Sequence, residues 1–182
     1  MKLLLSIYSL AYYPENPFLP HGGPADLRSA KAMVAHLRSP NGCPWDRAQT
    51  HSSLRRHLLE ESFEVLEALD SENSDAFRNE MGDLLLQILL HAQIAEDMGE
   101  FNIADVTEGL IDKIISRHPH VFGAKGTSTS DEFSADWRAV KERERGGQGS
   151  VSHMDSVPRS LPALAYSQAI QERAAQTGFD WP

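Results

Sequence analysis

Residues 74–98 read SDAFRNEMGDLLLQILLHAQIAEDM, and this stretch decides the fold. Its middle, Leu84–Leu90, is apolar on nearly every side of a helix, which is typical of a helix at the centre of a bundle or oligomer. Gly99 follows as a stop signal for the helix. No stretch of the sequence predicts a strand. We therefore expect an all-α protein with its core in residues 53–117.

Apolar residues at helical spacing predict further helices on both sides of this stretch. These helices are expected at residues 25–37, 53–69, 103–117, 132–145 and 161–177. Proline and glycine are frequent before residue 25, and a Gly-rich segment follows residue 145. We expect an irregular leader over 1–24, a main domain over 25–145, and a linker with a C-terminal helix over 146–182.

Composition limits the possible function classes. The chain has 182 residues, of which 41% are hydrophobic, and its formal net charge of -9 argues against a nucleic-acid-binding protein. The single cysteine, Cys43, excludes an internal disulfide framework and favours a reducing cytoplasm. No segment is apolar over the length needed to span a membrane, so we expect no membrane partner.

Two clusters of acids carry the chemistry. The first is EESFE at residues 60–64, and the second is EMGD at residues 80–83. Carboxylates three or four residues apart stand on one face of a helix. Two such faces turned towards each other would form a cage of oxygens that suits a hard cation such as Mg²⁺. A metal with open coordination positions commonly holds phosphates.

Simpler interpretations of the acids stay open. Acidic runs are commonly the solvated face of a helix, and Arg78 stands close enough in sequence to pair with Glu80. A di-iron carboxylate bundle is a third interpretation, and it requires Glu-x-x-His pairs. None of the eight histidines follows a glutamate at that spacing, which argues against di-iron chemistry.

Several blocks of the chain, in order, resemble one known family. The run CPWDRAQTHSSL at residues 43–54 resembles the opening signature of MazG-type nucleoside triphosphate pyrophosphohydrolases. The acids at residues 60–64 and 80–83 are similar to the metal motif of that family. Three further blocks are similar as well: GDLLLQ at 82–87, RHPHVFG at 117–123 and GFDW at 178–181. The resemblance covers about residues 26–182 and is to the short, single-repeat form.

The resemblance implies a fold and an activity. The fold is an all-α, four-helix-bundle MazG-like fold, usually completed by dimerisation, so we expect a homodimer or a higher homo-oligomer. The implied reaction is the Mg²⁺-dependent hydrolysis of nucleoside triphosphates to the monophosphate and pyrophosphate, with Mn²⁺ as a possible substitute. A broad range over ribo- and deoxyribonucleotides would suit an enzyme that removes unwanted nucleotides.

The resemblance also implies roles for residues at matching positions of the motifs. The expected metal ligands are Glu61, Glu64, Glu80 and Asp83. Glu60 and Glu61 are the expected catalytic carboxylates, with Glu60 acting as a further ligand or positioning the attacking water.

Four residues that follow the acids are expected to contact the substrate. Lys113 and Arg117, one helical turn apart, would meet the phosphates, and Trp137 and Lys141 resemble the segment that closes over the substrate. A base could stack on Trp45 or on Trp137, although each is also compatible with an ordinary core or interface tryptophan.

Two other functions stay open from the sequence. The first is a narrower pyrophosphatase on the same scaffold, specific for dUTP, dCTP or phosphoribosyl-ATP. The second is a non-catalytic, metal-binding dimer that acts through protein partners. The latter would bind nucleotide without turning it over.

Overall fold

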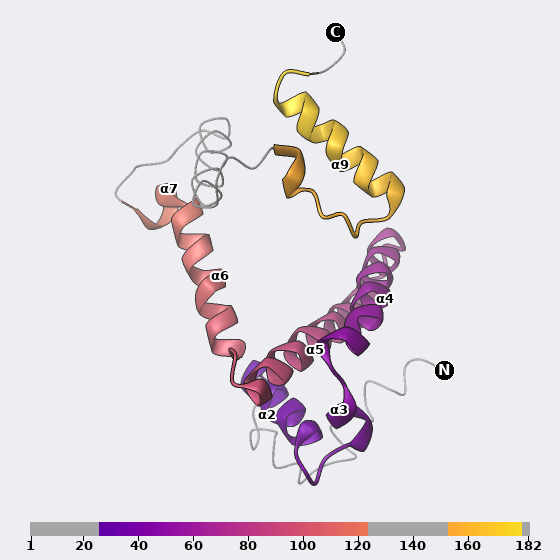
Figure 1. Ribbon diagram of the computed structural model, residues 1–182, viewed down its shortest axis with the longest axis vertical. Coiled ribbons are helices and arrows are strands. Elements are labelled where there is room, and N and C mark those ends of the chain that lie inside the picture. Colours follow the sequence, from indigo (N-terminus) through magenta and orange to yellow (C-terminus); the bar gives the residue numbers. More distant parts are fainter. Residues whose placement is uncertain (1–25, 124–152, 180–182) are drawn as a thin grey trace. The chain divides into compact units, whose positions relative to one another are not determined.

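The computed structural model describes residues 26–123 and 153–179, and within these ranges the regular structure is entirely helical (Figure 1). This confirms the expected all-α fold. The predicted leader and the predicted helix over 132–145 lie outside the described residues. None of the described helices combines the length and the apolar character that crossing a bilayer requires.

The chain divides into two compact units, residues 1–109 and 110–182. The first unit holds α2 (Leu27–Arg38), α3 (Pro44–Ala48), α4 (His51–Asp70), α5 (Ser74–Met98) and the start of α6 (Ile103–Arg117). The second unit holds the rest of α6, α7 (Pro119–Phe122), η2 (His153–Ser156) and α9 (Ala163–Gln176). The expected domain boundaries at 24/25 and 145/146 fall outside the described residues and stay predictions.

Local capping explains where the two longest helices begin and end. At the start of α4 the Thr50 side chain accepts from the Ser53 backbone N–H while the Ser53 hydroxyl accepts from the Thr50 backbone N–H, which is a capping box. This cap lets α4 begin at His51, two residues before the predicted start. Asn73 caps α5, and Gly99 ends it with φ +72, a left-handed conformation that favours glycine.

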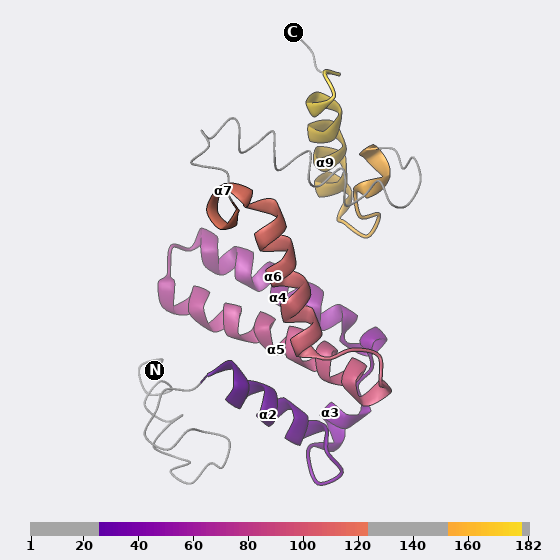
Figure 2. The same cartoon turned by 90° about the vertical axis from the view of Figure 1, so that its left-hand side faces the viewer.

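Helices α4 and α5 lie side by side as an antiparallel pair, joined by the short turn at residues 71–73 (Figures 1 and 2). Helix α2 packs against α5 on another side. The buried core shared by the three helices consists of Val34, Leu54, Leu89, Leu90 and Ile94. Leu54 is fully buried, so the first turns of α4 are fixed against α5 by apolar packing.

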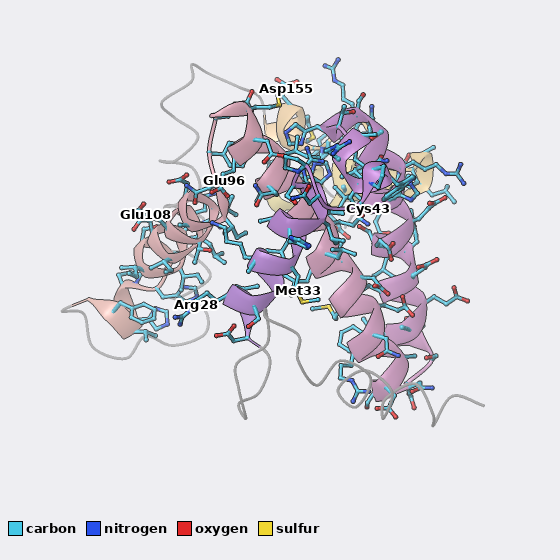
Figure 3. The ribbon with its side chains drawn as sticks, turned by 90° about the horizontal axis from the view of Figure 1, so that it is seen from below. Arg28, Met33, Cys43, Glu96, Glu108 and Asp155 are labelled. Carbon is cyan, nitrogen blue, oxygen red and sulfur yellow. The ribbon has the colours of Figure 1, made fainter. Side chains whose placement is uncertain are left out.

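One arginine ties the segment around α3 to the helices. The Arg38 side chain is only 8% exposed, and its Nε donates to Asp97 Oδ2 at 2.8 Å. Its Nη1 donates to the backbone oxygens of Asp46 at 2.6 Å and Gln49 at 3.2 Å. Figure 3 labels Cys43 where the chain leads into α3. Arg38 therefore fixes α3 against the C-terminal end of α5.

The apolar middle of α5 is only partly covered within one chain. Its Leu89 and Leu90 are buried, as the sequence predicts for a central helix. Four other apolar side chains of α5 are 36–47% exposed: Met81, Leu85, Leu86 and Ile88. Four apolar side chains of α4 are about half exposed: Leu59, Phe63, Leu66 and Leu69. We call these eight residues the open apolar face.

Candidate metal centre

Three of the predicted metal ligands come together between α4 and α5. Each of Glu61, Glu64 and Glu80 offers a carboxylate oxygen, and these oxygens lie within 4.8 Å of one another. Glu61 and Glu80 are half-buried, and Glu64 is exposed. We call these three residues the acid cluster. The antiparallel pairing of the helices, which the sequence alone does not give, brings Glu80 to the two glutamates of α4.

The acid cluster is electrostatically unfavourable without a cation. Burial raises the pKa of Glu61, and the neighbouring charges of Glu64, Asp83 and Glu80 raise it further, as does a side-chain hydrogen bond with Glu64. Both burial and like charges disfavour the ionised form. A cation among these oxygens would reverse both effects, because it would replace lost hydration and neutralise the repulsion.

The donor set fits a hard divalent cation. All three contributed groups are carboxylates, which are the preferred ligands of Mg²⁺ and Ca²⁺. Opposite ligands of an octahedral Mg²⁺ are about 4.2 Å apart, because each lies ~2.1 Å from the ion. The oxygens of the acid cluster lie within 4.8 Å of one another, which is close to that value. Three carboxylates also leave coordination positions for water and substrate oxygens.

The other two predicted acids of the site stand apart from the acid cluster. Asp83 is exposed and lies one helical turn after Glu80, near enough for its charge to raise the pKa of Glu61. The Glu60 carboxylate contacts two residues of its own helix. Its Oε1 accepts from Arg56 Nε at 2.7 Å, and its Oε2 lies 3.5 Å from His57 Nδ1. Their roles as ligand and catalytic carboxylate stay predictions.

Arg78, the residue that offered a simpler explanation for Glu80, pairs elsewhere. Its Nη1 lies 3.1 Å from Asp75 Oδ1, one turn earlier on α5. Glu80 is half-buried and faces Glu61 and Glu64 instead. Pairing with Arg78 therefore does not account for Glu80.

The predicted phosphate-binding residues lie on α6, beyond the first unit. Lys113 is exposed and Arg117 is half-buried, and the two are one helical turn apart as expected. Trp137 and Lys141 lie outside the described residues. The binding roles of all four residues stay predictions.

Two aromatic contacts were not predicted from the sequence. His51 Nδ1 lies 2.8 Å from His91 Nδ1, which joins α4 to α5 some three turns from the acid cluster. The Trp45 ring meets the His57 ring edge-on, with centroids 6.1 Å apart and planes at 70°. The sequence does contain a signal for the contact between His51 and His91: Gln87 and His91 are polar and four residues apart in an otherwise apolar stretch of α5.

Comparison with known proteins identifies relatives of this chain. The family model for the MazG nucleotide pyrophosphohydrolase domain matches residues 49–122, which include α4, the acid cluster and α5. The chain is 44% identical over 150 residues to the nucleoside triphosphate pyrophosphohydrolase of Escherichia coli. The chain belongs to the MazG family. That alignment covers 82% of this chain and 57% of the relative, so the chain spans little more than half of the relative's length.

Two further MazG relatives come from Thermotoga maritima. A protein described as nucleoside triphosphate pyrophosphohydrolase/pyrophosphatase MazG is 46% identical over 151 residues, covering 82% of this chain and 57% of the relative. The crystal structure of a MazG-related protein aligns with a TM-score of 0.52 and 25% identity. It covers 62% of this chain and 98% of the solved chain. The MazG fold thus accounts for the helical arrangement seen here.

Proposed function

We propose that this protein hydrolyses nucleoside triphosphates to the nucleoside monophosphate and pyrophosphate, with Mg²⁺ bound by the acid cluster. The observation that carries the proposal is the meeting of Glu61, Glu64 and Glu80 between α4 and α5 in a MazG domain. The names of the Escherichia coli and Thermotoga maritima relatives support the same reaction. Asp83 completes the proposed ligand set from the next turn of α5.

The reaction needs a directed water and a neutralised leaving group. The water oxygen bonds to the α-phosphorus, the bond from that phosphorus to the bridging oxygen breaks, and pyrophosphate leaves with the electron pair. Mg²⁺ at the acid cluster would supply charge neutralisation and a lowered pKa for a bound water. Lys113 and Arg117 offset the phosphate charge, with arginine able to donate to two oxygens at once.

Glu60 is the proposed acceptor of the water's proton, or the group that orients that water. Its carboxylate contacts Arg56 and His57 on α4, next to Glu61 in the sequence. The Arg56 side chain is 82% exposed, so this ion pair is weak and does not prevent Glu60 from contacting water. A carboxylate within hydrogen-bond reach of the water is the geometry that general-base catalysis requires.

A broad range of bases is the proposed specificity. Trp45 is 55% exposed and stands against His57, which lies one turn before Glu61 on α4. An exposed indole face accepts any base by stacking, because every base has a π-face. In this proposal Arg38 positions Trp45 by holding α3. A narrower enzyme would instead read base edges through hydrogen bonds.

A homodimer is the proposed assembly. The open apolar face of α4 and α5 leaves eight large apolar side chains at least a third exposed, and contiguous patches of this kind commonly mark interfaces. A second copy of the chain would cover this face and complete a four-helix arrangement from two helix pairs. Light scattering on wild type and on Ile88→Glu tests this: we expect the mass of a dimer for the former and of a monomer for the latter.

The activity is tested with the purified protein, the eight common ribo- and deoxyribonucleoside triphosphates, and Mg²⁺. We expect monophosphate and pyrophosphate in every case, with rates that differ modestly between bases. Glu61→Gln should lose more than the ~10–100-fold typical of losing an outer-shell partner of a metal. Glu67→Gln is the matched control, since Glu67 is an exposed glutamate of the same helix outside the acid cluster.

The products and the two variants separate the alternatives. Diphosphate and phosphate as products would contradict a pyrophosphohydrolase. Turnover of a single nucleotide would replace the broad range with a narrow one. Binding of nucleotide without turnover, unchanged in Glu61→Gln, would favour the non-catalytic dimer.

A further inference from the structure

His51 and His91 meet edge to edge between α4 and α5. Their Nδ1 atoms are 2.8 Å apart, and their rings are parallel within 2°, with centroids 5.1 Å apart. The distance between the ring centroids exceeds the distance between the Nδ1 atoms by about twice the distance from a ring's centre to its atoms. Both Nδ1 atoms therefore lie on the line that joins the two centroids. The arrangement is an in-plane N–H···N hydrogen bond. A cation held between two facing nitrogens would need them about 4 Å apart, so the pair is not a metal site.

This hydrogen bond determines which nitrogens carry protons. One ring must donate from Nδ1–H, and the other must accept at a bare Nδ1. A neutral acceptor ring then carries its proton on Nε2. Burial and the neighbouring His51 lower the pKa of His91, which favours the neutral form of that ring. The hydrogen bond therefore needs a proton on only one of the two Nδ1 atoms.

Two buried polar atoms on α5 favour one choice of donor. His91 Nε2 and Gln87 Oε1 are both buried and have no hydrogen-bond partner in the structure. The residues are four apart, so their side chains lie one above the other on the same face of α5. Gln87 is only 6% exposed, so water does not satisfy its oxygen from outside.

Only one assignment makes these two atoms complementary. If His51 donates, His91 carries Nε2–H, a buried donor one turn from the buried acceptor Gln87 Oε1. If His91 donates as a neutral ring, its Nε2 is an acceptor like Gln87 Oε1, and the two atoms cannot pair. We call His51, His91 and Gln87 the polar line, in which the structure forms only the hydrogen bond between the two histidines.

The polar line lies on the same seam between α4 and α5 as the acid cluster. Glu80, Gln87 and His91 are seven and four residues apart, which keeps them on one stripe of α5. His51 and Glu61 are ten residues apart on α4, or about 15 Å along the helix axis. Between them, Leu54 packs on Leu89 and Leu90 in the core cluster.

Apolar packing alone specifies the register of two such helices weakly, because a slip of one turn replaces one leucine with another. A directional polar contact specifies register, because a slip leaves buried polar atoms unpaired. We propose that His51 and His91 are positioning residues, whose hydrogen bond fixes the register of α4 against α5 and so keeps Glu61 and Glu64 opposite Glu80. The effect on catalysis rests on the proposed function, whereas the hydrogen bond and the register do not.

The hydrogen bond is tested directly by nitrogen-15 NMR of the imidazole rings in the wild-type protein. We expect His51 as the Nδ1–H tautomer, His91 as the Nε2–H tautomer, and a scalar coupling across the shared proton. Two Nε2–H tautomers without coupling would overturn the proposal. This measurement needs no variant and no activity.

The register is tested by the affinity for Mn²⁺, measured by electron paramagnetic resonance without nucleotide. His91→Leu removes the acceptor, and we expect affinity to fall about tenfold, as for the loss of an outer-shell partner. His91→Asn places an acceptor oxygen near the position of Nδ1 and should stay within about threefold of wild type, again on the scale of outer-shell effects. His36→Leu on α2 is the control for the substitution itself and should leave the affinity unchanged.

The outcomes separate this proposal from the proposed function. Wild type that binds Mn²⁺ but hydrolyses no nucleotide contradicts the function and leaves the register proposal standing. A folded His91→Leu protein that binds Mn²⁺ as tightly as wild type overturns the register proposal, whatever the activity. Equal losses in His91→Leu and His91→Asn would overturn it too, because a merely space-filling role predicts no rescue.

Discussion

The seam between α4 and α5 contains two polar groups of opposite character. In the acid cluster, Glu61, Glu64 and Glu80 repel one another, and burial raises the pKa of Glu61. In the histidine pair, His51 and His91 satisfy each other by one hydrogen bond at 2.8 Å. The carboxylates of the first group are like charges, whereas the two Nδ1 atoms of the second pair with each other and leave His91 Nε2 buried without a partner. The seam thus joins a region of like charges at one end to a directional hydrogen bond at the other.

The largest expected effect comes from a substitution that places a positively charged side chain in the acid cluster. Glu80→Lys places an ammonium beside Glu61 and Glu64, where it would neutralise them and exclude Mg²⁺. We expect turnover to fall at least ~1000-fold, because metal catalysis is worth several kcal/mol and each 1.4 kcal/mol is a factor of ten. Product formation is measured with Glu67→Lys as control. Turnover within tenfold of wild type would show that the acid cluster is not the catalytic site.

Removing the apolar packing that lies between the acid cluster and the histidine pair should lower the stability of the whole first unit. Leu54 is fully buried between the histidine pair and the acid cluster on α4, so Leu54→Ala leaves a cavity. We expect the free energy of unfolding in urea to fall by about 3 kcal/mol. Leu27→Ala is the control, since Leu27 is half exposed and should cost under ~1 kcal/mol. Similar losses in both variants would contradict the described core.

The affinity of the acid cluster for Mg²⁺ should depend on pH. Only the ionised form of Glu61 binds the cation, and the pKa of Glu61 is raised. Affinity should therefore increase as pH rises through that pKa, by up to about tenfold per pH unit for one released proton. Isothermal titration calorimetry between pH 5 and pH 8 measures this. A flat profile in wild type, matching that of Glu61→Gln, would remove Glu61 from the ligands.

The smallest expected effect concerns stability without metal. Folding raises the pKa of Glu61, so folding favours its protonated form, and the stability from this group is lost as pH rises through the folded pKa. Glu61→Gln keeps a neutral side chain at every pH. Without metal at neutral pH it should be more stable than wild type by about 0.5 kcal/mol, the scale of like-charge pairs on a helix.

This stability difference should narrow as the pH falls towards 4.5, the ordinary pKa of a glutamate. Urea unfolding in the presence of a chelator, over this pH range, gives the comparison. A variant less stable than wild type at neutral pH would show that the Glu61 charge is already compensated within the protein.

Helix positions were predictable because their signals are local. The predicted bounds of α5, 74–98, and of α6, 103–117, match the structure, since apolar periodicity and Gly99 act within a few residues. The start of α4 was placed two residues late, because the cap is Thr50 with Ser53 as its reciprocal partner. The 3₁₀ turn η2 and the short α3 and α7 were not predicted, because helices this short carry no periodicity.

The sequence by itself indicated the helices from their periodicity, a site for a hard cation from two acidic motifs, and membership of the MazG family from several ordered blocks. The tertiary structure decided which residues act together. It placed Glu80 with Glu61 and Glu64, left Glu60 with Arg56 on its own helix, and joined His51 to His91 across forty residues. The physical reason is that a residue's helix face depends on nearby sequence, whereas its partner depends on how two helices pair and in which register.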